Sequence, residues 1–212
     1  MTERFIVTGT DTGVGKTVFA AGLAGVVDRF YWKPVQSGLH EETDSEVVAR
    51  LSGLPAGRIL PEVYRLKMPL SPHRSAEIDG VAIEAAKLSL PALPGPLIVE
   101  GAGGLMVPLN RQTRFIDIFR QWRLPVVLCA RTALGTINHT LLSVEALRAR
   151  SIPLLGIAFI GDEMADTQKT IAEMGKVRIL GRLPRLDPLT PKGLSVAMRA
   201  AFNVADFMEA PH

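Results

Sequence analysis

The chain has 212 residues and 47% of them are apolar, which is enough to bury a core and excludes a disordered chain. Its 24 basic and 21 acidic residues leave a net charge of +3 without any basic block, so we expect no nucleic-acid partner. No apolar run approaches the about 18 residues of a membrane span. The chain opens directly into a strand pattern without a signal peptide, so we expect a cytoplasmic protein that makes no membrane contact.

Short apolar runs predict buried strands along most of the chain. These runs are residues 4–8, 30–34, 96–100, 125–130, 153–160 and 177–183. Helical patterns lie between most of them, at residues 15–30, 43–53, 137–151, 164–175 and 192–208. This alternation predicts an α/β fold, with a mostly parallel sheet flanked by helices on both faces.

The rest of the chain adds no second unit. Residues 54–80 are Pro-rich and irregular in pattern, and a loop of this length predicts a functional cover. The sequence contains no linker or repeat, so we expect a single domain over residues 1–212. Cys129 is the one cysteine and lies inside an apolar run, which predicts a buried, unreactive side chain.

The segment "TGTDTGVGKT" at residues 8–17 lies between the first strand and the first helix, and it predicts a phosphate-binding loop. Lys16 would reach the β and γ phosphates, and the Thr17 hydroxyl would hold Mg²⁺. Thr10 stands where a standard P-loop has its first glycine, so the loop is a P-loop variant. Its place between a strand and a helix predicts a P-loop NTPase-like fold. The residues expected to contact the nucleotide here are Gly13, Val14, Gly15, Lys16 and Thr17.

Three charged residues are predicted to lie at the same edge of the sheet. Lys33 and Glu100 each end a predicted strand, and the carboxyl ends of parallel strands meet at one edge. Asp44 lies at a predicted helix start. Each has an ordinary alternative: a surface charge for Lys33, a helix cap for Asp44, and an incidental acid in a glycine turn for Glu100. The glycines expected to let a substrate approach the backbone are Gly101, Gly103 and Gly104.

Four segments that follow one another along the chain resemble the dethiobiotin synthetase family, from about residue 4 to residue 160. They are "VTGTDTGVGKT", "KPVQSG", "VEGAGGLMVPL" and "LGTINHTLLS". The resemblance implies an ATP-dependent cyclo-ligase of biotin biosynthesis. Such an enzyme converts 7,8-diaminononanoate, CO₂ and ATP to dethiobiotin through a carbamic–phosphoric anhydride, with Mg²⁺ as cofactor. It also implies a homodimer whose substrate site is shared between the two subunits.

The resemblance further implies a role for individual residues. Lys16 and Lys33 would neutralise the reacting anions, while Thr12 and Ser37 would help hold the diamine and its carbamate. The Mg²⁺ ligands would be Thr17, Asp44 and Glu100. The substrate carboxylate would bind a helix start contributed by the other subunit, at Gly135, Thr136, Ile137 and Asn138. Residues 71–76 also resemble a segment near the substrate, where we expect His73 to be structural or to support other site residues rather than to act as a base.

Two departures from the family pattern concern the nucleotide. Gly13 stands where the best-known members carry an acidic side chain. Gly161 and Asp162 stand where members that prefer ATP often place an asparagine that reads adenine, so base selectivity stays open. The backbone groups expected to form a wall of the base pocket belong to Arg182, Leu183 and Pro184.

Three other classes of protein remain to be weighed. A dimeric P-loop ATPase of the partitioning or metal-delivery class usually carries a lysine early in the loop, where this chain has Asp11. An amidotransferase-linked synthetase of the cobyrinate type needs a glutaminase domain, for which the chain is too short. A passive nucleotide-binding module would leave Lys33, Asp44 and Glu100 without a purpose.

Overall fold

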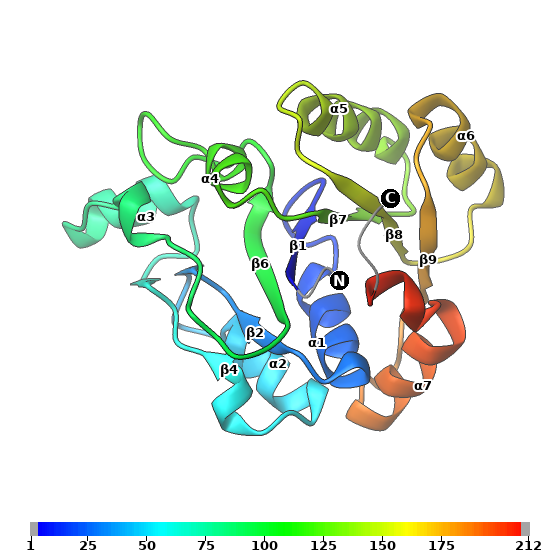
Figure 1. Ribbon diagram of the computed structural model, residues 1–212, viewed down its shortest axis with the longest axis horizontal. Coiled ribbons are helices and arrows are strands. Elements are labelled where there is room, and N and C mark those ends of the chain that lie inside the picture. The colour runs from blue at the N-terminus through cyan, green and yellow to red at the C-terminus, as the bar shows by residue number, and fades with distance from the viewer. Residues whose placement is uncertain (1–3, 209–212) are drawn as a thin grey trace.

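The computed structural model describes residues 4–208, and its centre is a seven-stranded sheet in the order β4-β2-β6-β1-β7-β8-β9 (Figure 1). All neighbouring strands in this sheet run parallel. The strands are β1 (Arg4–Gly9), β2 (Phe30–Trp32), β4 (Ile59–Leu60), β6 (Leu97–Gly104), β7 (Val126–Arg131), β8 (Leu154–Ile160) and β9 (Ile179–Leu183). The predicted α/β fold with a mostly parallel sheet is therefore confirmed.

Helices cover both faces of the sheet, with α4, α5 and α6 above it and α1, α2 and α7 below it in Figure 1. The helices of the described residues are α1 (Lys16–Val27), α2 (Asp44–Ser52), α3 (Pro72–Asp79), α4 (Phe115–Trp122), α5 (Thr136–Arg148), α6 (Ala165–Gly175) and α7 (Pro191–Ala201). Successive side chains of β1 alternate between the two faces. Phe5 and Val7 belong to the core between the sheet and helices α1 and α7, while Ile6 belongs to the core between the sheet and α4.

The helix predicted over residues 43–53 shows how local sequence sets an element. Thr43 is the N-cap of α2 and forms a capping box with Glu46, in which each side chain binds the other residue's backbone N–H. Gly53 ends the helix in the left-handed conformation, with φ of 72°. This helix places Asp44 in its first turn, beside the start of α1.

Several predicted elements were wrong in detail. Residues 54–80, predicted to be irregular, contain a 3₁₀ turn (Ala56–Arg58), β4, β5 (Tyr64–Leu66) and α3. The strand predicted over residues 30–34 stops at Trp32, before Pro34, which cannot donate to a ladder. The chain resumes as β3 (Val35–Ser37), which pairs with β5 in a separate two-stranded sheet.

The helix predicted over residues 192–208 was wrong at its end, because α7 stops at Ala201. The Asn203 side chain then accepts a hydrogen bond from the N–H of Ala205 and starts a separate 3₁₀ turn (Val204–Phe207). Helix α4 was not predicted at all; a further 3₁₀ turn spans Ala85–Lys87. Within residues 4–208, no helix combines the length and the apolar character that a bilayer crossing needs.

Candidate active site

The loop between β1 and α1 lies at the carboxyl edge of the sheet, where ligands of such folds bind. Gly15 has φ of 92° and is the N-cap of α1, so the helix begins at Lys16 with its free N–H groups facing the loop. A Cβ at Gly15 would lie 2.9 Å from the Ile160 side chain, so both conformation and space require glycine there. Gly13 is also left-handed, with φ of 71°, but has no neighbour within 4 Å of a Cβ.

The glycine-rich end of β6 packs directly against this loop. Gly9 pairs with Gly104, where a Cβ would lie 3.2 Å from the carbonyl oxygen of Thr10. A Cβ on Gly103 would lie 3.0 Å from the Thr12 hydroxyl. Small residues at this strand end therefore let the loop that follows β1 sit close to the loop that follows β6.

Lys33 is the centre of a buried ionic cluster at this edge. Its side chain is 2% exposed, and its Nζ lies 2.6 Å from Asp44 Oδ2 and 3.1 Å from Glu100 Oε1. The same nitrogen donates to the carbonyl oxygen of Gly101 at 3.0 Å. Lys16 Nζ is 3.9 Å from Glu100 Oε1. The structure thus brings together two lysines and two carboxylates that are far apart in the sequence.

Three oxygen atoms converge beside the lysines. The hydroxyl oxygen of Thr17 lies 2.8 Å from Asp44 Oδ1 and 2.8 Å from Glu100 Oε1. Its single proton can be donated to only one carboxylate at a time, so the second close approach has no hydrogen bond from Thr17 to support it. Such a group of hard oxygen atoms is the donor type that Mg²⁺ prefers.

The charges in the cluster shift one another's pKa. Burial pushes the pKa of Lys33 down, but Glu100 and Asp44 more than offset this and hold it above its ordinary value. Burial raises the pKa of Asp44, and the charge and hydrogen bond of Lys33 reverse this to a net lowering. Burial, aided by the charge of Lys33, lowers the pKa of Lys16. The pair of Lys33 and Asp44 is therefore ionised over the neutral range.

Sequence reasoning missed two residues that complete the cluster. Tyr31 is fully buried, and its hydroxyl donates to Glu100 Oε2 at 2.9 Å. Gln36 is buried, and its Oε1 accepts from the backbone N–H of Asp44 at 3.3 Å. Tyr31 looked like an ordinary strand residue in the sequence, and only its register against β6 shows its contact. Gln36 stood within the "KPVQSG" motif, which could have drawn attention to it.

A cavity of about 690 Å³ opens beside the cluster. It is lined by the loop after β1, by the segment from Lys33 to Ser37, and by Pro69, Leu70, Ser71 and Pro72. Part of the segment predicted to be a cover therefore borders this cavity. His73 does not line it; its Nδ1 lies 2.9 Å from the Ser71 hydroxyl.

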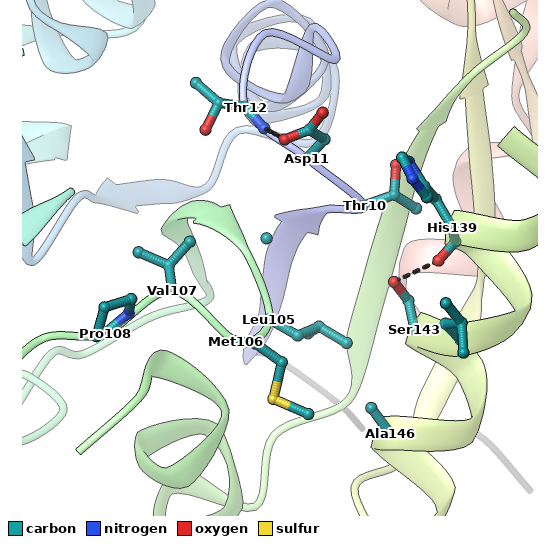
Figure 2. Close-up of a pocket in the computed structure, with 12 residues that line it drawn as sticks. Thr10, Asp11, Thr12, Leu105, Met106, Val107, Pro108, His139, Ser143 and Ala146 are labelled. Carbon is teal, nitrogen blue, oxygen red and sulfur yellow. Dashed lines mark hydrogen bonds between the residues drawn. The ribbon is translucent and has the colours of Figure 1, made fainter. Parts of the chain in front are cut away.

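A second hollow of about 630 Å³, which Thr12 also lines, lies between the loop after β1 and helix α5 (Figure 2). Its walls are largely apolar and come from residues 105–108 and from one side of α5, including Leu142 and Ala146. Asp11 lies at its rim, where the carboxylate accepts from the N–H of Thr12 at 2.7 Å and pairs with Arg131.

The predicted carboxylate-binding residues lie apart from the first cavity. None of Gly135, Thr136, Ile137 and Asn138 lines it. Gly135 is the N-cap of α5 with φ of 90°, and Thr136 is buried against Thr140. The side chain of Ile137 packs on the core under α5 and α6, and Asn138 is exposed. Within one chain, these four residues are not brought to Lys33.

The end of β8, predicted to meet the base, is held by β9. The N–H of Gly161 donates to the carbonyl of Leu183, and Arg182 Nη1 donates to the carbonyl of Gly161. Gly161 has φ of 127°, and a Cβ there would lie 2.5 Å from the Thr132 hydroxyl. The N–H of Gly161 and the carbonyl of Leu183 therefore already form a hydrogen bond with each other. Asp162 follows this turn and is exposed, and Pro184 follows β9.

Comparisons with known proteins show the family of the chain. A family model described as an AAA domain matches residues 3–193. The chain is 63% identical over 211 residues to an "ATP-dependent dethiobiotin synthetase BioD" of Rhodopseudomonas palustris (strain HaA2), covering 100% of this chain and 99% of that protein. It is 60% identical to the protein of the same name from Agrobacterium fabrum (strain C58 / ATCC 33970), with both chains covered completely. The chain belongs to the dethiobiotin synthetase family. As a member of the dethiobiotin synthetase family it is a ligase-type enzyme, and the predicted resemblance is confirmed.

Solved structures resemble the chain in fold alone. A ParA family ATPase from Chlorobium tepidum TLS has a TM-score of 0.57 at 12% identity, over 92% of this chain and 91% of that one. A chain of the MinC:MinD cell division protein complex of Aquifex aeolicus has a TM-score of 0.55 at 11% identity, over 99% of this chain and 97% of that one. These likenesses confirm the mostly parallel sheet flanked by helices that was predicted for this dethiobiotin synthetase family member.

Proposed function

We propose that the chain closes the ureido ring of dethiobiotin from 7,8-diaminononanoate, CO₂ and ATP. One observation carries the mechanism: Lys16 and Lys33 meet two carboxylates at the P-loop end of an open cavity. One amine of the substrate adds to CO₂ and loses a proton to give a carbamate. The carbamate oxygen attacks the γ phosphorus of ATP, and ADP leaves. The second amine then attacks the carbamoyl carbon, and inorganic phosphate and a proton leave as the ring closes.

The main barrier to phosphoryl transfer here is the repulsion between two anions. Enzymes of this type act mostly by positioning the reactants and stabilising charge, without a nucleophilic side chain. Lys33 and Lys16 both line the cavity, and Lys16 is the first residue of α1. We assign them to the carbamate and the transferring phosphoryl group respectively.

We propose Thr17, Asp44 and Glu100 as the residues that hold Mg²⁺. Their converging oxygen atoms fit this ion. Residues 4–208 contain no group of three or more His, Cys, Asp or Glu side chains placed to hold a metal. Two carboxylates and one hydroxyl suit Mg²⁺, which usually takes one or two carboxylates and completes its shell with water and substrate phosphates. When bound, the ion would neutralise charge on the β and γ phosphates.

Ser37 is proposed to contact the diamine or the carbamate, and the surroundings of its hydroxyl support this. Its Oγ is buried and has no hydrogen-bond partner among the described residues, while Ser37 lines the cavity beside Lys33. A buried hydroxyl normally has a partner, and a polar substrate would supply one. Thr12 lines the same cavity from the P-loop side and is assigned the same task.

A homodimer with shared sites accounts for the separate position of the α5 N-terminus. We propose that Gly135 to Asn138 bind the carboxylate of a substrate held mainly by the partner subunit. The surface around this helix start supports an interface, because Leu134 is fully exposed and Leu142 and Met106 are about half exposed. Leu142 and Met106 also line the apolar hollow shown in Figure 2. Large apolar groups gathered in this way are typical of interaction surfaces.

The function is tested by incubating the purified protein with diaminononanoate, bicarbonate, Mg²⁺ and ATP and measuring dethiobiotin and ADP. We expect ADP to form only when the diamine is present. Rapid ATP hydrolysis without diamine, and no dethiobiotin, would instead support a P-loop ATPase. Repeating the assay with CTP and GTP tests the base pocket at Gly161 and Asp162, for which the Leu183 and Pro184 backbone would form a wall. A cytoplasmic location, where ATP is available, is proposed with this function.

A further inference from the structure

We propose that Tyr31 is a positioning residue, whose hydroxyl holds Oε2 of Glu100 so that Oε1 is the oxygen offered to Thr17 and Lys33. The inference rests on the proposed function only in giving Glu100 a task in binding Mg²⁺. It adds a residue of the second strand to the site, one that contacts neither of the cavities at the P-loop.

Strand register explains why the two side chains meet. Tyr31 on β2 pairs with Ile98 on the parallel neighbour β6. Glu100 lies two residues beyond Ile98, and residues i and i+2 of a strand share a face. Tyr31, Ile98 and Glu100 therefore point to the face covered by α1, where Thr17 lies in the first turn of the helix. The phenol only has to lean along the strand direction for its hydroxyl to reach the carboxylate.

The two oxygens of Glu100 have different surroundings. Oε1 lies 2.8 Å from the Thr17 hydroxyl and 3.1 Å from Lys33 Nζ. Oε2 accepts from the Tyr31 hydroxyl at 2.9 Å. Glu100 and Tyr31 are both 0% exposed, so water does not reach Oε2 from the surface. Within the described residues, the tyrosine is the donor that satisfies this oxygen.

Without the hydroxyl, the carboxylate would lose its fixed orientation. The terminal torsion of a glutamate is broad and roughly two-fold, so either oxygen can face a given partner. An unsatisfied buried oxygen is costly, and the carboxylate would turn to share both oxygens between Lys33 and Thr17. A turned carboxylate presents a different oxygen position to a metal ion, and loss of such supporting contacts typically weakens metal binding about 10–100-fold.

The test compares Tyr31→Phe with Tyr64→Phe. These are the two tyrosines of the chain, so each variant removes one hydroxyl and keeps its ring. Tyr64 is also buried, and its hydroxyl accepts from the N–H of Glu84 at 2.9 Å, away from the cluster. It is the matched control for the general cost of losing a buried hydroxyl hydrogen bond.

Binding of Mn²⁺ as a probe of the Mg²⁺ site is measured by electron paramagnetic resonance, with a non-hydrolysable ATP analogue present. We expect Tyr31→Phe to bind Mn²⁺ about 10-fold more weakly or worse, and Tyr64→Phe to match the wild type. Equal Mn²⁺ affinity in Tyr31→Phe and the wild type would overturn the proposal. Turnover of Tyr31→Phe should rise toward the wild-type rate as Mg²⁺ is increased, which loss of folded protein would not produce.

A second measurement covers the case in which Tyr31→Phe does not fold. In Tyr64→Phe, Tyr31 is the one remaining tyrosine, and ultraviolet resonance Raman spectra report its hydrogen bond directly. We expect the signature of a hydroxyl that donates to a carboxylate, unchanged when Mg²⁺ and the ATP analogue bind. A hydroxyl that is released on binding would reject the positioning role. The Mn²⁺ and Raman readouts do not need the diamine, so absence of dethiobiotin with the wild type would reject the proposed function and leave these two tests of Tyr31 intact.

Discussion

Replacing Lys33 by methionine should damage stability as well as catalysis. Methionine has a similar length but leaves the partly buried Asp44 without its ion-pair partner, the buried Glu100 with only the more distant Lys16 at 3.9 Å, and the carbonyl of Gly101 without its donor. Removing one partner of a buried ion pair costs about 3–5 kcal/mol, because the other charge stays desolvated. For a chain of this size about 1 kcal/mol shifts Tm by roughly 2–4 °C, so we expect a Tm lower by about 6–20 °C.

The assay is thermal unfolding followed by circular dichroism, without nucleotide or Mg²⁺, together with dethiobiotin formation below the transition. Lys33→Met should remain folded at 25 °C and lose at least about 10²-fold in turnover. Lys33→Met combined with Glu100→Gln should recover part of the lost Tm, because the stranded charge is gone, but recover no turnover. The control is Lys192→Met, since Lys192 is exposed and should change neither quantity. A wild-type Tm for Lys33→Met would refute the buried-charge reasoning.

Three other predictions follow from the same contacts. Lys16→Ala should lower turnover by about 10²–10³-fold but lower Tm less than Lys33→Met does, since Lys16 Nζ is 3.9 Å from Glu100; an equal loss of Tm would contradict this. Cys129 is fully buried, and burial raises the pKa of its thiol. A disulfide reagent should therefore label Cys129 only as fast as the protein unfolds, and rapid labelling of the native state would disprove its burial. The pKa of Asp44 is lowered from its ordinary value of 3.8. The stability that the ionised Asp44 adds to the fold is therefore complete above pH 3.8 and is lost as the pH falls through the lowered pKa. In an acid titration of the apoprotein followed by circular dichroism, wild-type stability should fall more than that of Asp44→Asn.

Much of the fold could be predicted from sequence because its signals are local. Apolar runs and helical stripes gave the order of strands and helices, and the Thr43 and Glu46 capping box marked one helix start. The prediction of strands failed where a strand is formed by tertiary pairing and not by a local apolar pattern. β3 and β5 are only three residues each and are stabilised by pairing with one another, so neither has a pattern of its own.

Part of the candidate site also followed from sequence alone. The carboxyl ends of parallel strands share an edge, so a lysine after one strand and a glutamate at the end of another are expected to be neighbours of a P-loop. The sequence could not reveal which atoms of Lys33 and Glu100 meet, because a hydrogen bond depends on positions within a few tenths of an ångström.

The sequence by itself determined the alternation of strands and helices and the residues that match the family, and it predicted a phosphate-binding loop between the first strand and the first helix. Only the tertiary structure decided that the Tyr31 hydroxyl donates to Glu100, that Lys33 is buried between two carboxylates, and that the α5 N-terminus does not line their cavity. The reason is physical: motifs record chemistry at neighbouring positions of the chain, whereas register and burial arise when distant strands pack together.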